Sequence, residues 1–476
     1  MLNPDMLEEA RKSVAEFHEL IRLGFINKTG EFVSVHMYPP MMQHPPMKGG
    51  DIFKGYIPRK NGQFAVYAHI PFCIQQCAFC YYPNVIGASE NEKDAYLDCM
   101  DREMGICLQK LGMDRLKARS ILLGGGTPTH MSPAQMKRFL GFFTSRLDMS
   151  AMTQFGCDLD PLTMLGYEGR ERMRILRGAG VSRLALGAQS FSDAILKKMG
   201  RHHNNADNIR AIGVAKEMGF KLNLELICDY PGETPEQFLA IVKQAMSLDV
   251  DEIMIYRLKI IPCAINPCAI NKLLDSRPDP LSSNDEQIAV KSMARDTLRS
   301  GGYRETLTRV FSKTAADYSH YAKDYMGDQY DTVGFGYYAM CQLHDRFCQS
   351  TYDLKEYCRE LEAGRLPIMN GLIRSRDQQF RRSLLMPLKG NLAVSKEAYR
   401  ERTGTAMSEV FGKKIDLLKK YGLLEEDAEF LKATEKGRFY ADEIAHFFFH
   451  PDLMPFPREQ YADGPLNPYN DNETMN

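Results

Sequence analysis

The chain has 476 residues, of which 25% are charged, and its net charge is −1. This length allows two or three domains with a sizeable buried core. The balanced charge argues against nucleic acid or an anionic membrane as a partner. The acid-containing N-terminus and the lack of an apolar run of about 18 residues predict a cytoplasmic protein without a signal peptide or membrane span. Twelve cysteines in such a chain indicate reduced thiols and a metal site rather than disulfides.

The first region, residues 1–60, is expected to contain a helix and an irregular segment. An amphipathic pattern over 4–24 predicts the helix, with Asn3 as its N-cap and Pro4 in its first turn. The following string HMYPPMMQHPPMKGGD (36–51) is rich in proline, which excludes a regular helix or a central strand. It is either a plain linker or a lid on the substrate side.

The second region, residues 61–365, alternates strand and helix patterns. Strands are expected over 64–70, 120–125, 154–160, 182–188, 221–228 and 251–258. Amphipathic helical stretches between them include 90–110, 132–147 and 234–247. This alternation predicts an α/β fold with parallel strands joined by crossover helices. Six such units predict a partial (β/α)6 barrel with an extension, whose site lies at the C-terminal ends of the strands.

The third region, residues 366–476, is expected to be mostly helical. Within 419–444 a helix, a turn, the string AEFLKAT and a second helix predict a small winged-helix-like domain. A packing role is favoured, because acidic residues are mixed throughout and DNA recognition needs a basic helix.

The string PCAINPCAIN (262–271) is an internal repeat that contains Cys263 and Cys268. Two cysteines without two more nearby do not meet the usual requirement for a second cluster. A loop over the barrel mouth is the favoured interpretation.

Three cysteines directly follow the first expected strand in YAHIPFCIQQCAFC (67–80). Cys73, Cys77 and Cys80 have the spacing C-x3-C-x2-C, and thiolates suit iron–sulfur clusters and zinc. In a four-iron cluster, three cysteines leave one iron open to a non-protein ligand. A zinc site completed by His69 or a distant cysteine, or three unrelated buried thiols, are the alternatives.

The cysteine spacing, with the aromatic Phe79 before the last cysteine, resembles the radical S-adenosylmethionine superfamily. The fuller string resembles the oxygen-independent coproporphyrinogen III oxidase branch, which includes haem chaperones and anaerobic haem-degrading methyltransferases. The resemblance implies a [4Fe-4S] cluster on Cys73, Cys77 and Cys80, with S-adenosyl-L-methionine on the open iron. Reduction by a donor such as flavodoxin or ferredoxin would then give a 5′-deoxyadenosyl radical that abstracts hydrogen from the substrate.

Two further strings match the family's cofactor contacts. Glycines in LLGGGTPT (122–129) let the backbone approach a ligand closely. The resemblance implies that Gly125, Gly126 and Thr127 contact the methionyl amino group. It also implies that Gln189 contacts the ribose and that Arg201 pairs with the cofactor carboxylate, a pairing suited to a guanidinium.

Other matches are single residues on expected strands. The resemblance places Glu225 where the family has an aspartate in its fifth-strand string and Ile227 against the adenine. It places Tyr67 near the sulfonium, as the catalytic candidate, and Asp158 at a position where the relatives have glutamate.

Three positions depart from the coproporphyrinogen oxidase pattern. Tyr82 lies two residues after the last cluster cysteine, where those enzymes carry a further cysteine. Asp158 replaces their glutamate, and Asp229 with Tyr230 replaces their Gly-Leu pair. These changes argue against oxidative decarboxylation without touching the cluster.

The C-terminal layout, including RSRDQQFRRSLLMPL and DTVGFGYYAMC (331–341), resembles that of the haem-degrading methyltransferases. The predicted function is therefore a radical enzyme that uses one or two S-adenosylmethionines to transfer a methyl or methylene group to a tetrapyrrole or another flat conjugated substrate. The alternatives are a coproporphyrinogen III oxidase (dehydrogenase) of porphyrin biosynthesis and a haem chaperone without radical turnover.

Overall fold

The structure is a computed structural model that describes residues 4–47, 51–258 and 281–470. The expected N-cap Asn3 and the repeat that contains Cys263 and Cys268 lie outside the described residues.

Six parallel strands form the centre of the molecule, and all six were predicted from the sequence. In spatial order they are β9 (Glu252–Arg257), β8 (Lys221–Cys228), β7 (Arg183–Gln189), β6 (Gln154–Leu159), β4 (Leu116–Gly125) and β1 (Gln63–Ile70). Each neighbouring pair is parallel. Their apolar sequences reflect burial on both faces, which is usual for parallel sheets covered by helices. The α/β fold class is therefore confirmed.

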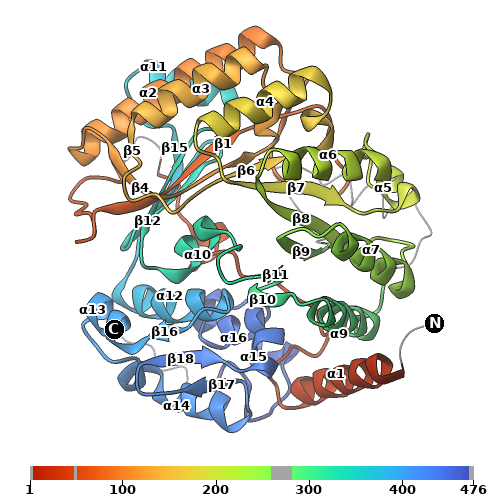
Figure 1. Ribbon diagram of the computed structural model, residues 1–476. Helices are drawn as coiled ribbons and strands as arrows, with labels where there is room; N and C mark the ends of the chain where they lie inside the picture. The colour runs from red at the N-terminus through yellow and green to blue at the C-terminus, as the bar shows by residue number, and fades with distance from the viewer. Residues whose placement is uncertain (1–3, 48–50, 259–280, 471–476) are drawn as a thin grey trace.

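Crossover helices cover one face of this sheet (Figure 1). They are α2 (Glu90–Leu111), α3 (Pro133–Ser145), α4 (Gly166–Gly178), α5 (Asp193–Lys198), α6 (Asn205–Glu217) and α7 (Pro235–Ser247). Several begin at a capping box, such as Ser89 with Glu92 before α2 and Thr234 with Gln237 before α7. These boxes satisfy amide groups that the helix itself leaves free.

The sheet continues beyond the six strands at both edges, which the sequence did not reveal. On one side lie β12 (Asp331–Phe335), β13 (Met340–Gln342), β14 (Arg346–Ser350) and β15 (Ile368–Ile373), and on the other β11 (Val310–Ser312) and β10 (Arg304–Leu307). Strand β14 reads RFCQS and is buried throughout, so its polar residues hide the apolar pattern on which strand prediction depends. Strand β15 lies wholly beyond the boundary expected at 365, yet it belongs to this sheet. Three further short strands lie earlier in the chain: β2 (Phe72–Cys73), β3 (Val85–Ile86) and β5 (Leu147–Asp148).

The C-terminal region is mostly helical, as expected, and carries a small three-stranded sheet. Its elements are α12 (Arg376–Lys389), β16 (Val394–Ser395), α13 (Lys396–Thr403), α14 (Met407–Lys420), β17 (Leu424–Glu426), β18 (Phe430–Ala433), α15 (Glu435–Phe439) and α16 (Ala441–Phe447). Helices α10 (His320–Gly327) and α11 (Leu354–Glu362) precede it. Across the described residues, we find no helix with both the length and the apolar character needed to cross a bilayer.

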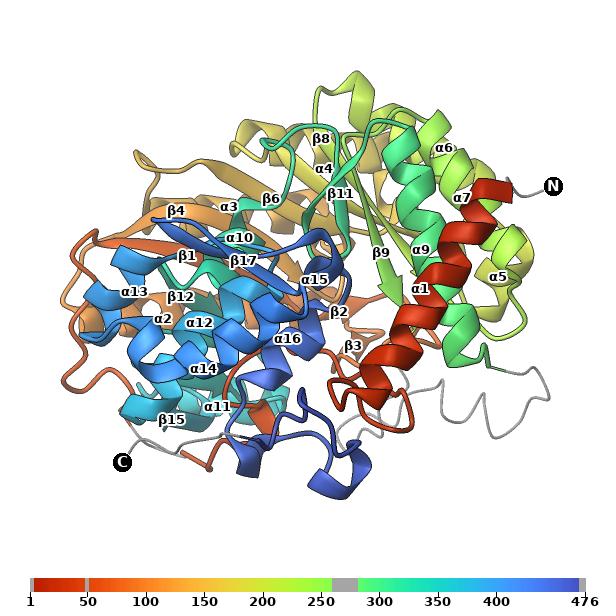
Figure 2. The same ribbon diagram turned by 90° about the horizontal axis from the view of Figure 1, so that it is seen from below.

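The N-terminal helix α1 (Pro4–Arg22) lies beside α9 (Asn284–Ser300), as Figure 2 shows. Its buried Phe17 and Leu20 belong to the same hydrophobic core as the C-terminal helices. Tyr38, from the proline-rich segment, packs its ring against Phe449 at 4.8 Å between centroids. Residues between Phe17 and Tyr38 and residues between Phe380 and Leu466 therefore share one core.

A buried carboxylate, Asp328, links three parts of the chain. It lies at the end of α10 with a side chain 1% exposed, and it pairs with Arg59 at 2.9 Å and with Arg382. Arg402 lies 3.9 Å away, and Arg59 also pairs with Asp331 at the start of β12. Burial by itself raises the pKa of a carboxyl, but the three guanidinium groups hold the pKa of Asp328 well below its usual range.

We expect Asp328→Asn to lower the free energy of unfolding by about 3–5 kcal/mol, because it leaves buried guanidinium groups without a counter-charge. Chemical denaturation measures the loss. The matched control is Asp249→Asn, which has the same backbone φ of 53° but an exposed ion pair with Lys313, so a much smaller loss is expected. Equal losses for the two variants would contradict a linking role for Asp328.

Candidate functional site

A cavity of about 460 Å³ lies at the C-terminal ends of the parallel strands. All twelve residues singled out in the sequence line it: Tyr67, Cys73, Cys77, Cys80, Gly125, Gly126, Thr127, Asp158, Gln189, Arg201, Glu225 and Ile227. They come from five strands and the loops that follow them, so chain segments far apart in sequence meet here. This placement agrees with the rule that sites form at this end of parallel strands.

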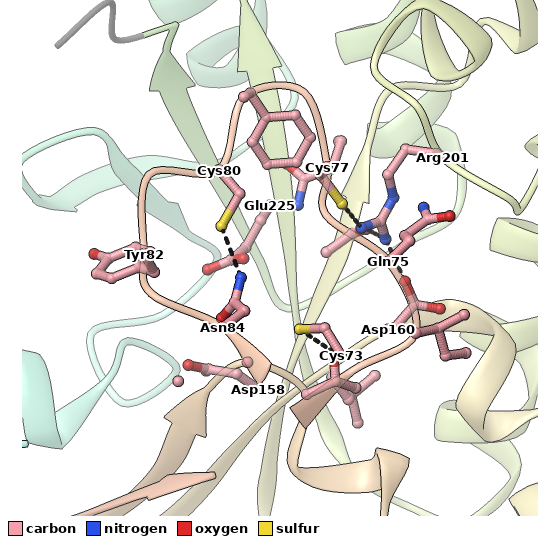
Figure 3. A pocket seen from close by; sticks show the side chains of 18 of the residues that line it. Cys73, Gln75, Cys77, Cys80, Tyr82, Asn84, Asp158, Asp160, Arg201 and Glu225 are labelled. Carbon is pink, nitrogen blue, oxygen red and sulfur yellow. Dashed lines mark hydrogen bonds and ion pairs between the residues drawn. The ribbon is translucent and has the colours of Figure 1, made fainter. Parts of the chain in front are cut away.

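The three cysteine sulfurs face one hollow from different sides, as Figure 3 shows. Each sulfur lies near a different polar side chain. The Cys73 Sγ is 3.7 Å from Thr127 Oγ1, and the Cys77 Sγ is 3.2 Å from Arg201 Nη1. The Cys80 Sγ is 3.3 Å from Asn84 Nδ2. The loop itself is fixed by backbone bonds, including Ala78 N–H to Met199 O at 3.0 Å. These contacts hold the three thiols around the same hollow.

This arrangement fits a multi-iron cluster better than one metal ion. Within the described residues, no three His, Cys, Asp or Glu side chains come close enough together to hold a single ion. Burial raises the pKa of Cys73 to about 12, so this thiol needs a bound cation to become the thiolate. Three sulfurs spread around a hollow suit a cubane, whose irons present separate corners.

His69 does not line this cavity. Its ring is buried beneath Gly125, where an added Cβ would come within 2.7 Å of it, and its Nδ1 lies 3.2 Å from the Tyr67 hydroxyl. Burial lowers the pKa of His69 to about 3, so the ring is neutral. The geometry therefore gives no support to a zinc site completed by His69.

The glycine string presses closely on the start of the cysteine loop. A Cβ on Gly126 would lie 2.7 Å from the carbonyl of Pro71. The Gly126 amide donates to Ile70 O and the Thr127 amide to Phe72 O, both at 2.8 Å. Only glycine allows this approach, which explains the residue type independently of any ligand.

Gln189 and Arg201 lie on the next wall. Gln189 ends β7 with a φ of 63°, an uncommon conformation for a residue other than glycine. Arg201 is largely buried and donates from Nη2 to Asp160 Oδ2 at 2.6 Å and to Gly187 O at 3.0 Å. Asp160 therefore fixes the guanidinium beside Cys77.

Two partly buried carboxyl groups line the cavity at its floor. Asp158 on β6 and Glu225 on β8 lie on either side of β7. Burial, reinforced by the charge of Glu225, raises the pKa of Asp158 to about 8. Burial also raises the pKa of Glu225, which accepts a bond from the Tyr256 hydroxyl at 3.3 Å. At neutral pH the carboxyl pair of Asp158 and Glu225 can therefore carry a proton.

Asp160, Asn84 and Tyr256 were missed in the sequence. Asp160 offered a signal, because it follows Asp158 by two residues within the strand expected over 154–160, and such residues share a face. Asn84 and Tyr256 offered none, since their role depends on how separate segments pack.

Comparison with known proteins gives two family matches. The model "Radical SAM superfamily" matches residues 67–245 and the model "HemN C-terminal domain" matches residues 375–440.

Similar proteins span most of the chain. "Heme chaperone HemW" of Bacillus subtilis is 25% identical, over 80% of this chain and 97% of its own length. "Oxygen-independent coproporphyrinogen III oxidase" of Pseudomonas aeruginosa is 25% identical, over 82% of this chain and 86% of its own. The solved structure of coproporphyrinogen III oxidase (HemN) from Escherichia coli matches with a TM-score of 0.74 at 22% identity, over 87% of this chain and 96% of that one.

We expect the stability of the wild-type chain to fall between pH 5 and pH 8 through Asp158. Its folded-state pKa is about 8 and an ordinary aspartate ionises near 3.9, so in this range the unfolded chain holds fewer protons. At this site the loss reaches about 1.4 kcal/mol per pH unit.

Asp158→Asn removes this ionisation, and its denaturation curves should show a shallower dependence on pH. Asp148→Asn is the control, since Asp148 is not buried and its pKa is lowered by hydrogen bonds from Ser150. An unchanged slope in Asp158→Asn would contradict the raised pKa.

Proposed function

We propose that this protein, which carries a radical S-adenosylmethionine domain followed by a HemN C-terminal domain, is an iron–sulfur enzyme that acts on a tetrapyrrole. One observation carries the proposal. Three thiols of a single short loop face the same cavity as the glycine string, Gln189 and Arg201. A site with three soft ligands and room for an organic molecule beside them suits a cluster with one open iron.

Cys73, Cys77 and Cys80 would hold the [4Fe-4S] cluster, and S-adenosylmethionine would lie in the rest of the cavity. When bound and reduced, this pair of cofactors supplies a 5′-deoxyadenosyl radical that abstracts hydrogen from the substrate. A reduced flavodoxin or ferredoxin would provide the electron.

The chain's own residues would bind and orient the cofactor. Backbone groups of Gly125, Gly126 and Thr127, which line the cavity, would contact the methionyl amino group. Arg201, already fixed by Asp160, would direct its guanidinium at the methionyl carboxylate. Gln189 would contact the ribose, and Ile227, which is 6% exposed, would cover the adenine.

The floor residues would exclude water and hold a proton. Tyr67 and Asp158 come from the strands on either side of β4, and a Cβ on Gly124 of β4 would come within about 3 Å of both side chains. Because the pKa of Asp158 is about 8, this carboxyl is protonated near neutrality and can donate a hydrogen bond. A neutral floor also avoids repelling an anionic ligand.

Aromatic side chains at the cavity support a flat substrate. Tyr81 and Tyr82 are stacked, with ring centroids 4.6 Å apart and planes at 28°, and both line the cavity. Phe79 and Tyr256 line it as well. Such surfaces favour a conjugated macrocycle, since aromatic rings stack in offset arrangements.

The proposal also specifies which reaction the enzyme performs. Tyr82 stands where the coproporphyrinogen oxidases carry a further cysteine, so we favour methyl or methylene transfer with two S-adenosylmethionines. The matched relatives do not specifically support this choice. A haem chaperone is the second candidate, favoured by the match over 97% of the length of the Bacillus subtilis "Heme chaperone HemW". Oxidative decarboxylation is the third.

We expect alanine at Cys73, Cys77 or Cys80 to prevent cluster assembly. Iron and sulfide bound per chain after anaerobic reconstitution should fall at least tenfold, and reductive cleavage of S-adenosylmethionine should fall with them. Cys358→Ala is the matched control, because this partly exposed thiol does not line the cavity. Full iron loading in Cys77→Ala would contradict the ligand assignment.

Product analysis separates the three reactions. Reduced, reconstituted protein is incubated anaerobically with S-adenosylmethionine and either haem or coproporphyrinogen III. Methyl or methylene transfer predicts S-adenosylhomocysteine together with 5′-deoxyadenosine and a tetrapyrrole of greater mass. Decarboxylation predicts carbon dioxide and no S-adenosylhomocysteine. Stoichiometric haem binding without either nucleoside product would sustain the chaperone function instead.

A further inference from the structure

A second cavity, of about 70 Å³, lies behind strands β8 and β9. Cys228 and Ile255 line it, whereas their chain neighbours Ile227 and Tyr256 line the first cavity. Because successive strand residues point to opposite faces, the two cavities lie on opposite sides of these strands. Arg257, at the end of β9, lines both.

The walls of the second cavity are apolar and come from distant parts of the chain. They include Phe32, Phe238, Ile288, Ala294, Phe311 and Phe439. Helix α9 supplies one wall, the β10–β11 hairpin another and the C-terminal region a third. An apolar pocket with a few polar groups is the usual form of a small-molecule site.

Cations outnumber carboxylates around this cavity. Among the described residues, four cationic side chains (Arg257, Lys291, Arg295 and Arg309) and two carboxylates (Asp229 and Glu305) line it. Two of the cations already have carboxylate partners. Arg309 pairs with Asp442, and the Arg257 Nε lies 3.7 Å from Asp229 Oδ2.

The other two cations, Lys291 and Arg295, make no hydrogen bond to a carboxylate in the part of the chain that the structure describes. The Arg295 Nε lies 3.8 Å from Asp296 Oδ1, and the nearby carboxyl of Glu443 acts on Lys291 through its charge. Lys291 donates to the backbone carbonyl of Phe439, and its Nζ lies 4.1 Å from the centroid of that ring. Arg295 lies over the same ring at 4.9 Å, and its buried Nε makes no hydrogen bond to any residue that the structure describes. Burial lowers the pKa of Lys291 to about 8.

Lys291 and Arg295 are four residues apart on α9, so they project side by side from one face of the helix. A charge removed from water is costly unless an opposite charge meets it. An anion that entered the cavity would meet both cations, and the planar guanidinium of Arg295 matches the two oxygens of a carboxylate.

We propose that the second cavity binds a small organic carboxylate, with its oxygens on Lys291 and Arg295 and its hydrocarbon part against Phe311 and Ile288. The cavity of about 70 Å³ is several times the ~10–15 Å³ that a cavity needs to hold one water, which suits an acid of two or three carbons. A free acid fits better than an arm of a ligand in the first cavity, because β8 and β9 separate the two. The site is independent of the proposed radical chemistry.

The test uses the full chain without added cofactors and the probe 3,3,3-trifluoropropionate, observed by fluorine NMR. We expect a saturable broadening of the probe signal that added propionate reverses. The neutral analogue 3,3,3-trifluoropropionamide should show at least tenfold weaker binding. Equal binding of the acid and the amide would overturn the proposal.

Substitutions show whether the probe binds in the second cavity or in the first. Arg295→Met should weaken binding of the acid at least tenfold, and Arg295→Lys should restore part of it. Arg299→Met is the matched control one turn further along α9, since Arg299 pairs with Glu435 and does not line the cavity. Wild-type affinity in folded Arg295→Met would overturn the proposal. If Arg295→Met does not fold, Lys291→Gln gives the same test.

A competition experiment identifies the source of the carboxylate. Coproporphyrin III should leave the probe bound if the natural ligand is a free small acid. Displacement by coproporphyrin III, but not by its tetramethyl ester, would instead assign the same cations to a carboxylate arm of a larger ligand.

Discussion

The parallel pairing of β1 with β4 is the constraint on which the candidate site depends. The register places Ile70 opposite Gly125 and His69 opposite Gly124, so the cysteine loop and the glycine string leave the sheet at the same edge. Backbone hydrogen bonds continue the pairing past the strand ends, from Gly126 to Ile70 and from Thr127 to Phe72. Backbone bonds of this kind do not depend on rotamers, so the loop is positioned by the sheet itself.

Charge is distributed in layers along the face of the parallel sheet that bears the cavity. At the bottom, the buried Arg183 pairs with Glu252 and forms a closed ion pair. Above it, Asp158 and Glu225 face the cavity without a cation of their own at hydrogen-bond distance among the described residues, and burial raises the pKa of both. Arg201 with Asp160 forms the next layer beside the cysteines. The electrostatic character of the cavity therefore changes from uncharged at the floor, where Asp158 and Glu225 lie, to polar at the mouth, where Arg201 lies. Such a cavity suits a ligand with a charged head group and an apolar ring.

The sequence was informative where the physical signal is local. Six parallel strands could be predicted because each is an apolar run between helical patterns, and the three cysteines because all lie on one loop. All twelve residues singled out line one cavity, although their roles stay proposals. Strands such as β14 could not be predicted, since Arg346 and Gln349 are buried there by packing that no local pattern encodes. Arg257, which touches both cavities, likewise gave no signal in sequence.

The core shared by α1 and the C-terminal helices bears on the order in which the protein folds. Helix α1 packs against α9, so part of its apolar face can be covered once Asn284–Ser300 has been synthesised. Phe17 and Leu20 also belong to the same hydrophobic core as Phe447 and Phe448, which lie far later in the chain. That part of the α1 surface stays uncovered until the later segment has been made, and transiently exposed apolar surface favours aggregation.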